Sequence, residues 1–255
     1  MYLPDSSLLT NITVQGHTRL GDILFEKKYI TIRSLENRLY TDAELARLPE
    51  LPAEHPHYKE WQLRKRMLHR LCRYLAKRRG ATEILEIGCG NGWLAHHLAE
   101  TPGTLVTGLD INFTELQQAA RVFSSDPNLC FVHGDIRSGI LAGRRFDVIV
   151  FAASIEYFPS LKRIILTCMD YLNAGGEIHI VDTRFYRITQ IEWARKRTQA
   201  YYSSFGYPEM ADQHFNFTLN DLKSFHYSIL YDPDAVRYRF ARNKNLCQWI
   251  RVRNN

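Results

Sequence analysis

Several features are missing from this sequence of 255 residues, and each absence excludes a class of protein. No apolar stretch approaches the roughly 18 residues of a membrane span; the longest, Val148 to Ala153, has the length of a strand. The five cysteines lie far apart without a C-x-x-C pair, which argues against a disulfide framework and against a zinc site. The opening residues MYLPDSSLLTN lack a basic region before an apolar core. We therefore expect a cytoplasmic protein with reduced thiols, no membrane association and no obligatory metal.

Internal repeats and low-complexity tracts are also absent, and 45% hydrophobic and 24% charged residues are typical of a globular protein. The net charge of +6 leaves nucleic acid, an acidic surface or an anionic small molecule open as partners. Overall charge does not choose among them.

What the sequence does contain is a regular alternation of strand-like and helix-like segments, which begins near residue 82. Apolar runs separated by amphipathic stretches are typical of right-handed βαβ crossovers on a parallel sheet. The helix expected after Pro159 shows a 3.6-residue period, and Gly175 and Gly176 are expected to form left-handed turns after it. The expected strands are 83–87, 104–109, 129–133, 146–151 and 177–182, and the expected helices are 93–99, 113–123 and 161–172.

Two further regions flank this alternation. Before it, a basic segment ending at Arg79 is expected to form a packed helix; after it comes a helical stretch from Ile188 to Ser203. Two late strands, 225–231 and 247–253, have no long crossover between them, so an antiparallel pair at the sheet edge is expected.

The segment ILEIGCGNGWLA, residues 84 to 95, leads from a strand through Gly88, Gly90 and Gly92 into a helix. Such a loop lets backbone amides approach a ligand and points a helix N-terminus toward it. Asp110, at the end of the second strand, is placed to bind the hydroxyls of a ribose, and Asp135, after the third, to meet the amine of an adenine. Together they indicate an adenosine pocket.

The choice among adenosine cofactors depends on the glycine spacing. A dinucleotide loop, G-x-G-x-x-G, would have its third glycine at position 93, which is Trp93. The spacing here is E-x-G-x-G-x-G. With VTGLDIN, FVHGDI, FDVIVFAASIEYF and LNAGGEIHIVD following in order, residues 83 to 182 resemble the class I S-adenosylmethionine-dependent methyltransferases.

This resemblance implies a doubly wound, seven-stranded, mostly parallel α/β sheet whose last strand is antiparallel. It divides the chain into a helical N-terminal extension, residues 1–80, and a methyltransferase domain, residues 81–255. The cofactor would be S-adenosylmethionine and the product S-adenosylhomocysteine. The resemblance implies that the glycine loop holds the methionine part and that His55 to Trp61 contributes to the pocket. The other implied cofactor-binding residues are Glu86, acting indirectly, Asp110 and Ile111 at the ribose, Asp135 and Ile136 at the adenine, and Phe151.

Structural alternatives exist for the individual residues. A glycine-rich turn can serve the turn alone, Asp110 can be a helix N-cap, and Cys89 is best explained as a small filler, because no base accompanies it. The combination of segments carries the prediction.

Catalysis by methyl transfer can rest largely on proximity and alignment, so no universal catalytic residue is expected. Glu156 and Tyr157 follow the fourth strand, where the family binds the acceptor, although a solvated loop carboxylate and a packing ring are their commoner roles. His214 is the residue to test as a base. It lies in a segment, 185–217, with nine aromatic residues, which can cover either the active site or the sheet.

The favoured partner is a small-molecule methyl acceptor. One alternative is an RNA methyltransferase, because residues 64–79 carry eight Lys or Arg, although such charges commonly form the solvated face of a packed helix. Another is a non-catalytic protein that keeps the cofactor pocket. The sequence does not indicate which molecule accepts the methyl group, which of its atoms is methylated, or the oligomeric state.

Overall fold

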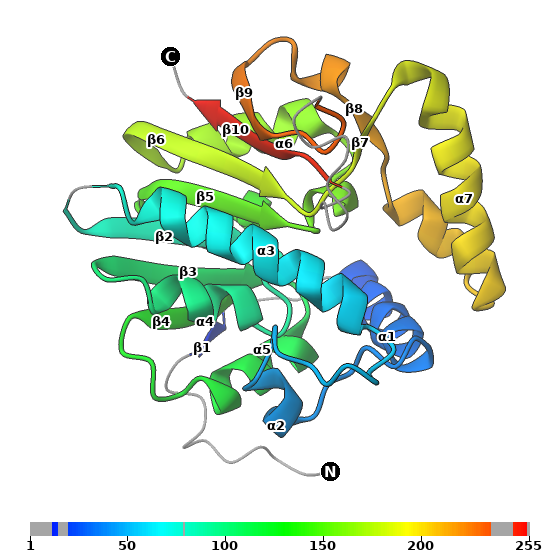
Figure 1. The fold of residues 1–255 in the computed structure, drawn as a ribbon, viewed down its shortest axis with the longest axis horizontal. Coiled ribbons are helices and arrows are strands. Elements are labelled where there is room, and N and C mark those ends of the chain that lie inside the picture. The colour runs from blue at the N-terminus through cyan, green and yellow to red at the C-terminus, as the bar shows by residue number, and fades with distance from the viewer. Residues whose placement is uncertain (1–11, 15–19, 79, 236–246, 254–255) are drawn as a thin grey trace. The chain divides into compact units, whose positions relative to one another are not determined.

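A computed structural model of the chain describes residues 12–14, 20–78, 80–235 and 247–253. These residues fall into two compact units. The first comprises Ile12–Val14 and Tyr40–Arg144, and the second comprises Leu20–Leu39 and the described residues from Arg145 onward. Figure 1 labels the helices and strands.

The strands of the first unit all run parallel. β2 (Thr82–Ile87), β3 (Thr104–Asp110) and β4 (Leu129–His133) are successive neighbours, and β1 (Ile12–Val14) pairs with β4 on the side away from β3. Nearly every residue of β2 is buried, as expected for a parallel strand covered on both faces. The shared direction brings the carboxyl ends of β2, β3 and β4 to one edge.

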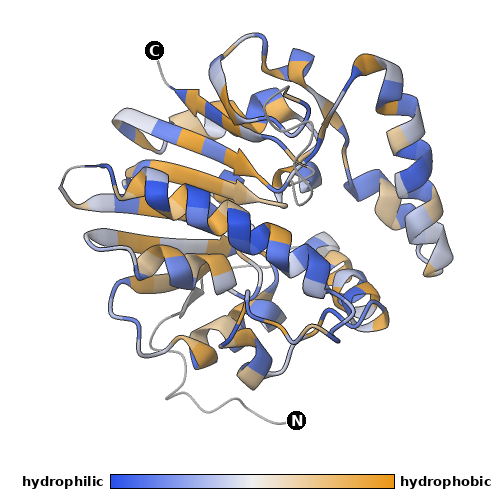
Figure 2. Ribbon diagram, in the orientation of Figure 1, coloured by the Kyte–Doolittle hydropathy of each residue, from blue (hydrophilic) through white to orange (hydrophobic). Residues whose placement is uncertain are grey.

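The helices of the first unit follow the expected periodicity. α3 buries an apolar stripe that includes Trp61, Met67 and Leu71, and Figure 2 shows hydrophilic colouring along the same helix. Asn112 caps the N-terminus of α5, and its side chain accepts the N–H of Glu115. The helices are α2 (Asp42–Leu45), α3 (Tyr58–Leu75), α4 (Trp93–Ala99), α5 (Phe113–Val122) and the 3-10 helix η2 (Ile136–Ser138).

The second unit has a mixed sheet. β5 and β6 are parallel, and β10 runs antiparallel between β6 and β9. A separate pair of two-residue strands, β7 and β8, is parallel. The bounds are β5 (Phe146–Ala152), β6 (Leu172–Val181), β7 (Phe185–Tyr186), β8 (Phe217–Thr218), β9 (His226–Tyr231) and β10 (Trp249–Arg253).

The helices of the second unit come from both ends of the chain. Ile32 of α1 forms an apolar cluster with Tyr202 of α7 and Met210, so an early helix packs on the aromatic-rich segment. The bounds are α1 (Leu20–Leu35), α6 (Leu161–Met169) and α7 (Ile191–Ser204), with 3-10 helices η3 (Ile155–Tyr157), η4 (Ile188–Gln190), η5 (Pro208–Gln213) and η6 (Leu219–Leu222).

The predicted fold class is confirmed. Each strand expected from the sequence is present, and the last is antiparallel; β1, β7 and β8 are too short for the sequence pattern to reveal. The prediction that both Gly175 and Gly176 adopt the left-handed conformation is wrong. Gly175 has a φ of 74°, whereas Gly176 lies in β6, where an added Cβ would be 2.9 Å from the carbonyl oxygen of Asn173. Gly176 is therefore required for space. In the part of the chain described, no helix combines the length and apolar character needed to cross a membrane.

Candidate functional site

The glycine loop between β2 and α4 requires glycine for both conformation and space. Gly88, Gly90 and Gly92 all have positive φ, between 53° and 74°, a region that disfavours other residues. At Gly92 an added Cβ would also lie 2.7 Å from Cζ of Phe131. Cys89 is buried and burial raises the pKa of its thiol well above the usual value, which fits the filler role.

The carboxylate of Asp110 holds the loop from the end of β3. Its Oδ2 accepts the N–H of Gly90 at 2.7 Å, and its Oδ1 accepts the N–H of Asn112 at 2.7 Å. The helix-cap alternative for Asp110 is therefore wrong, because Asn112 caps α5. Burial raises the pKa of Asp110, and the N–H groups of Asn112 and Gly90 oppose that rise. Each carboxylate oxygen retains a lone pair, so Asp110 can also accept ligand hydroxyls.

Three buried polar atoms of the first unit have no partner among the described residues. They are Nε of Arg66 on α3, Oε2 of Glu86, whose residue is 2% exposed, and Nδ1 of His133, whose Nε2 lies 3.1 Å from the carbonyl oxygen of Ile111. Burial first, and Asp110 second, raise the pKa of Glu86 well above its usual value. An unsatisfied buried polar atom costs roughly 1–3 kcal/mol. Unsatisfied polar groups beside the glycine loop fit a polar ligand. The sequence did not single out His133, because its only signal is its position just before Asp135.

The other residues expected at the cofactor have different surroundings. Asp135 accepts the backbone N–H of Arg137 at 2.8 Å and its Nε–H at 2.9 Å. Ile136 is 1% exposed. Phe151 is fully buried in β5 of the second unit, with its ring 5.8 Å from that of Phe158. Their cofactor roles stay predictions.

The second unit brings together the three residues suggested for catalysis. The N–H of Phe215 donates to the carbonyl oxygen of Glu156 at 2.7 Å, which ties η3 to the segment after η5. The ring of Tyr157 meets that of His214 edge-on, with centroids 5.6 Å apart. The carboxylate of Glu156 accepts the hydroxyl of Thr183 at 2.7 Å, so its orientation is fixed.

Burial keeps both Tyr157 and His214 neutral at pH 7. Burial raises the pKa of Tyr157, which shares a hydrogen bond with Tyr202, so Tyr157 is a neutral phenol at pH 7. Burial lowers the pKa of His214 to about 4, so its imidazole is neutral. Nδ1 of His214 is buried and has no partner among the described residues. A neutral imidazole with an unpaired nitrogen can accept a hydrogen bond or a proton.

Helix α1 completes this cluster, which the sequence did not reveal. Phe25 and Tyr29 place their ring centroids 5.8 and 6.0 Å from that of Tyr157. The guanidinium of Arg33 lies 4.7 Å from the centroid of Tyr29 and pairs with Glu36 at 2.9 Å. These residues precede the methyltransferase-like motifs and carry no motif of their own.

The backbone beside the cluster is strained. Ala153 and Asp182, directly after β5 and β6, have φ values of 53° and 55°. The N–H of Ala153 donates to the carbonyl oxygen of Val181 at 3.1 Å, so the two turns are linked. Non-glycine residues in this region cost roughly 1–3 kcal/mol each and concentrate at functional sites.

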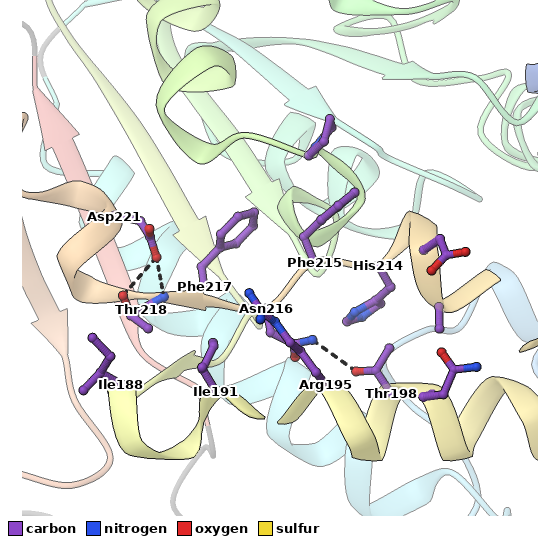
Figure 3. A pocket seen from close by; sticks show the side chains of 14 residues that line it. Ile188, Ile191, Arg195, Thr198, His214, Phe215, Asn216, Phe217, Thr218 and Asp221 are labelled. Atoms are coloured by element: carbon purple, nitrogen blue, oxygen red, sulfur yellow. Dashed lines mark hydrogen bonds between the residues drawn. The ribbon is translucent and has the colours of Figure 1, made fainter. Parts of the chain in front are cut away.

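A pocket of about 650 Å³ opens beside His214 (Figure 3). This volume lies within the usual range for small-molecule sites. The lining mixes apolar side chains with amides, hydroxyls and both signs of charge: Pro159, Ile188, Ile191, Arg195, Thr198, Gln199, Ala211, Asp212, His214, Phe215, Asn216, Phe217, Thr218 and Asp221.

Residues 84–176 match the family model described as a methyltransferase domain. A malonyl-[acyl-carrier protein] O-methyltransferase of Halalkalibacterium halodurans is 31% identical over 123 residues, which are 45% of this chain and 45% of that protein. A ubiquinone biosynthesis O-methyltransferase of Citrobacter koseri is 29% identical over 110 residues, 41% of this chain and 45% of that protein. The chain thus matches less than half the length of each relative.

Among solved structures, a DhpI-SAM-HEP complex aligns with a TM-score of 0.56 and 17% identity, covering 94% of this chain and all of that one. At this low identity, the structural alignment shows a shared fold alone. The segment matched by the family model carries the glycine loop, Asp110 and Asp135.

Proposed function

Because residues 84–176 form a class I, S-adenosylmethionine-dependent methyltransferase domain, we propose that the whole chain transfers a methyl group to a small-molecule acceptor. The observation that carries this proposal is the Asp110 carboxylate bound to the N–H of Gly90. It joins the end of β3 to the glycine loop and leaves acceptor positions for ribose hydroxyls.

The donor is held by groups of the first unit. Gly88 to Gly92 present backbone to the methionine part, Asp110 accepts the ribose hydroxyls, and Glu86 and His133 offer their unsatisfied atoms. When bound, S-adenosylmethionine supplies a methyl group on a sulfonium that leaves as the thioether S-adenosylhomocysteine. The chain's contribution is alignment and exclusion of water.

The acceptor is held by the second unit, in the pocket beside His214. The named relatives are O-methyltransferases, which favours an oxygen acceptor here. A hydroxyl must lose its proton as it attacks, and Nδ1 of His214 is an unpaired atom available to take it. Tyr157, a neutral phenol bonded to Tyr202, packs edge-on against His214 and so positions its imidazole.

The packing of α3 favours this function over RNA methylation. Its apolar stripe is buried and two of its cations are paired within the protein, Arg64 with Glu60 and Lys65 with Glu50. Phosphate binding would require those cations to face a ligand.

Two measurements test the proposal. Calorimetry with S-adenosylmethionine and S-adenosylhomocysteine is expected to give micromolar to submillimolar binding, and no binding of either contradicts the cofactor assignment. Incubation of cofactor labelled on the methyl group with a cell extract, separated into metabolites and RNA, is expected to label metabolites. Label confined to RNA would establish the rival function, and binding without transfer would indicate a non-catalytic protein.

A further inference from the structure

Two histidines and a glutamate at the end of α4 form a compact group of metal-ligand side chains. His96, His97 and Glu100 each offer one ligand atom, and these three atoms lie within 4.8 Å of one another. The two imidazole rings have their centroids 4.9 Å apart. All three residues belong to the first unit, and the donor site proposed above uses none of them.

The hydrogen bonds of His97 leave one of its nitrogens for a cation. Nε2 lies 2.7 Å from the carbonyl oxygen of Leu48, which can only accept, so Nε2 carries the proton. In the neutral imidazole, Nδ1 then has a lone pair, and it faces Oε2 of Glu100 at 2.7 Å. Two acceptors this close require a proton or a metal cation between them. A ligating histidine typically donates its other N–H to a backbone carbonyl, as His97 does to Leu48.

His96 is held in place by residues outside the group. Its Nδ1 lies 2.5 Å from Oδ2 of Asp126, and its ring stacks on that of Phe123 with centroids 4.3 Å apart. Phe123 is 4% exposed, so the stack fixes the plane of the imidazole. Among the described residues, Nε2 of His96 has no hydrogen-bond partner, and this nitrogen remains available to a ligand.

We propose that His96, His97 and Glu100 bind a divalent transition-metal ion such as Zn²⁺, with water completing the coordination. Imidazole and carboxylate groups are ligands of this class of ion. At metal–ligand distances of about 2.1 Å, a tetrahedral ion needs Nδ1 of His97 and Oε2 of Glu100 roughly 3.4 Å apart. The Glu100 side chain is 59% exposed, so it can move outward to admit the ion. The wide spacing of the cysteines argues against a thiolate zinc site and carries no information about a site of this kind.

Titration of the untagged protein with Zn²⁺ and Co²⁺ tests the site. Calorimetry with Zn²⁺ is expected to show binding that His97→Gln abolishes. Asp126→Asn, which removes the charge behind the His96 ring, should weaken binding 10- to 100-fold. Bound Co²⁺ should give a d–d absorption spectrum without a thiolate charge-transfer band, because its ligands are nitrogen and oxygen. The matched control is His69→Gln, an exposed position on α3, which should bind Zn²⁺ like the unaltered protein.

Three outcomes overturn the proposal. A thiolate charge-transfer band would place the ion on cysteine. Unchanged Zn²⁺ affinity in both His97→Gln and Asp126→Asn would place it elsewhere in the chain. No binding by the unaltered protein would mean that a proton alone lies between His97 and Glu100. Thermal melting in the presence of a chelator shows whether each variant folds, and Asp126→Asn decides the result if His97→Gln does not.

Discussion

The two groups of candidate site residues are drawn from the chain in different ways. In the first unit, those around the glycine loop lie between Glu86 and Asp135 in the sequence. In the second unit, those around Tyr157 come from α1, η3, α7 and the segment near His214. The first group consists of backbone amides and carboxylates bonded to them. The second consists of rings packed edge-on and a histidine that burial keeps neutral. A site made of successive strand ends has a short sequence signature, whereas no local motif shows which distant helices pack together around Tyr157 and His214.

The largest expected effect is on the loop itself. Gly92→Ala should lower the free energy of unfolding by roughly 2–5 kcal/mol, because it adds left-handed strain and places a Cβ 2.7 Å from Phe131. Urea unfolding measures this loss. Gly139→Ala is the matched control, since Gly139 has a φ of 80° with nothing within 4 Å of the added Cβ; it should cost about 1 kcal/mol. Equal losses would show that crowding at the loop is unimportant.

The next largest effect is expected at Asp110, which accepts the N–H of Gly90 and which we propose to bind the ribose. Asp110→Ala should weaken S-adenosylmethionine binding about 100-fold, because it removes two hydrogen bonds from a charged acceptor and releases Gly90. Calorimetry gives the comparison with Asp42→Ala, which breaks a surface pair with Arg121 in the same unit and should leave affinity unchanged. Undiminished binding in Asp110→Ala would refute the donor site.

In the second unit, His214 makes stability depend on pH. Burial lowers the pKa of His214 from 6.5 to about 4, so between these values the unfolded chain binds a proton that the folded chain does not. Stability should therefore fall as the pH decreases from 6.5 toward 4, by roughly 1–3 kcal/mol. Urea unfolding at pH 7 and 4.5 measures the slope, which should shrink in His214→Gln and persist in His69→Gln, an exposed position. An unaltered slope in His214→Gln would contradict the assignment.

The smallest effect is expected at Tyr157. Tyr157→Phe removes the hydroxyl that pairs with Tyr202, and should raise KM for the acceptor about fivefold, equivalent to about 1 kcal/mol. The Kd for S-adenosylmethionine should not change. Steady-state kinetics with the acceptor that the labelling experiment identifies provide the readout, with Tyr227→Phe on β9 as control. An equal change in the Kd for S-adenosylmethionine would contradict the assignment of Tyr157 to acceptor binding and of the glycine-loop residues to cofactor binding.

Much of the fold and the donor loop was predictable from the sequence. Strand positions followed from apolar runs, and the glycine spacing with Asp110 led to a methyltransferase domain, because these contacts join residues at successive strand ends. The helix-cap alternative for Asp110 needed the structure, since only coordinates show which N–H the carboxylate accepts.

By itself, the sequence determined the α/β class, the antiparallel last strand and the type of cofactor loop, since local periodicity and turn chemistry decide those features. Tertiary structure alone decided that α1 packs on the aromatic segment, that Tyr157 meets His214, and that Trp61 meets Trp93. Each of these contacts joins residues far apart in the chain through side-chain packing, and a buried ring finds its partner from the shape of the folded core.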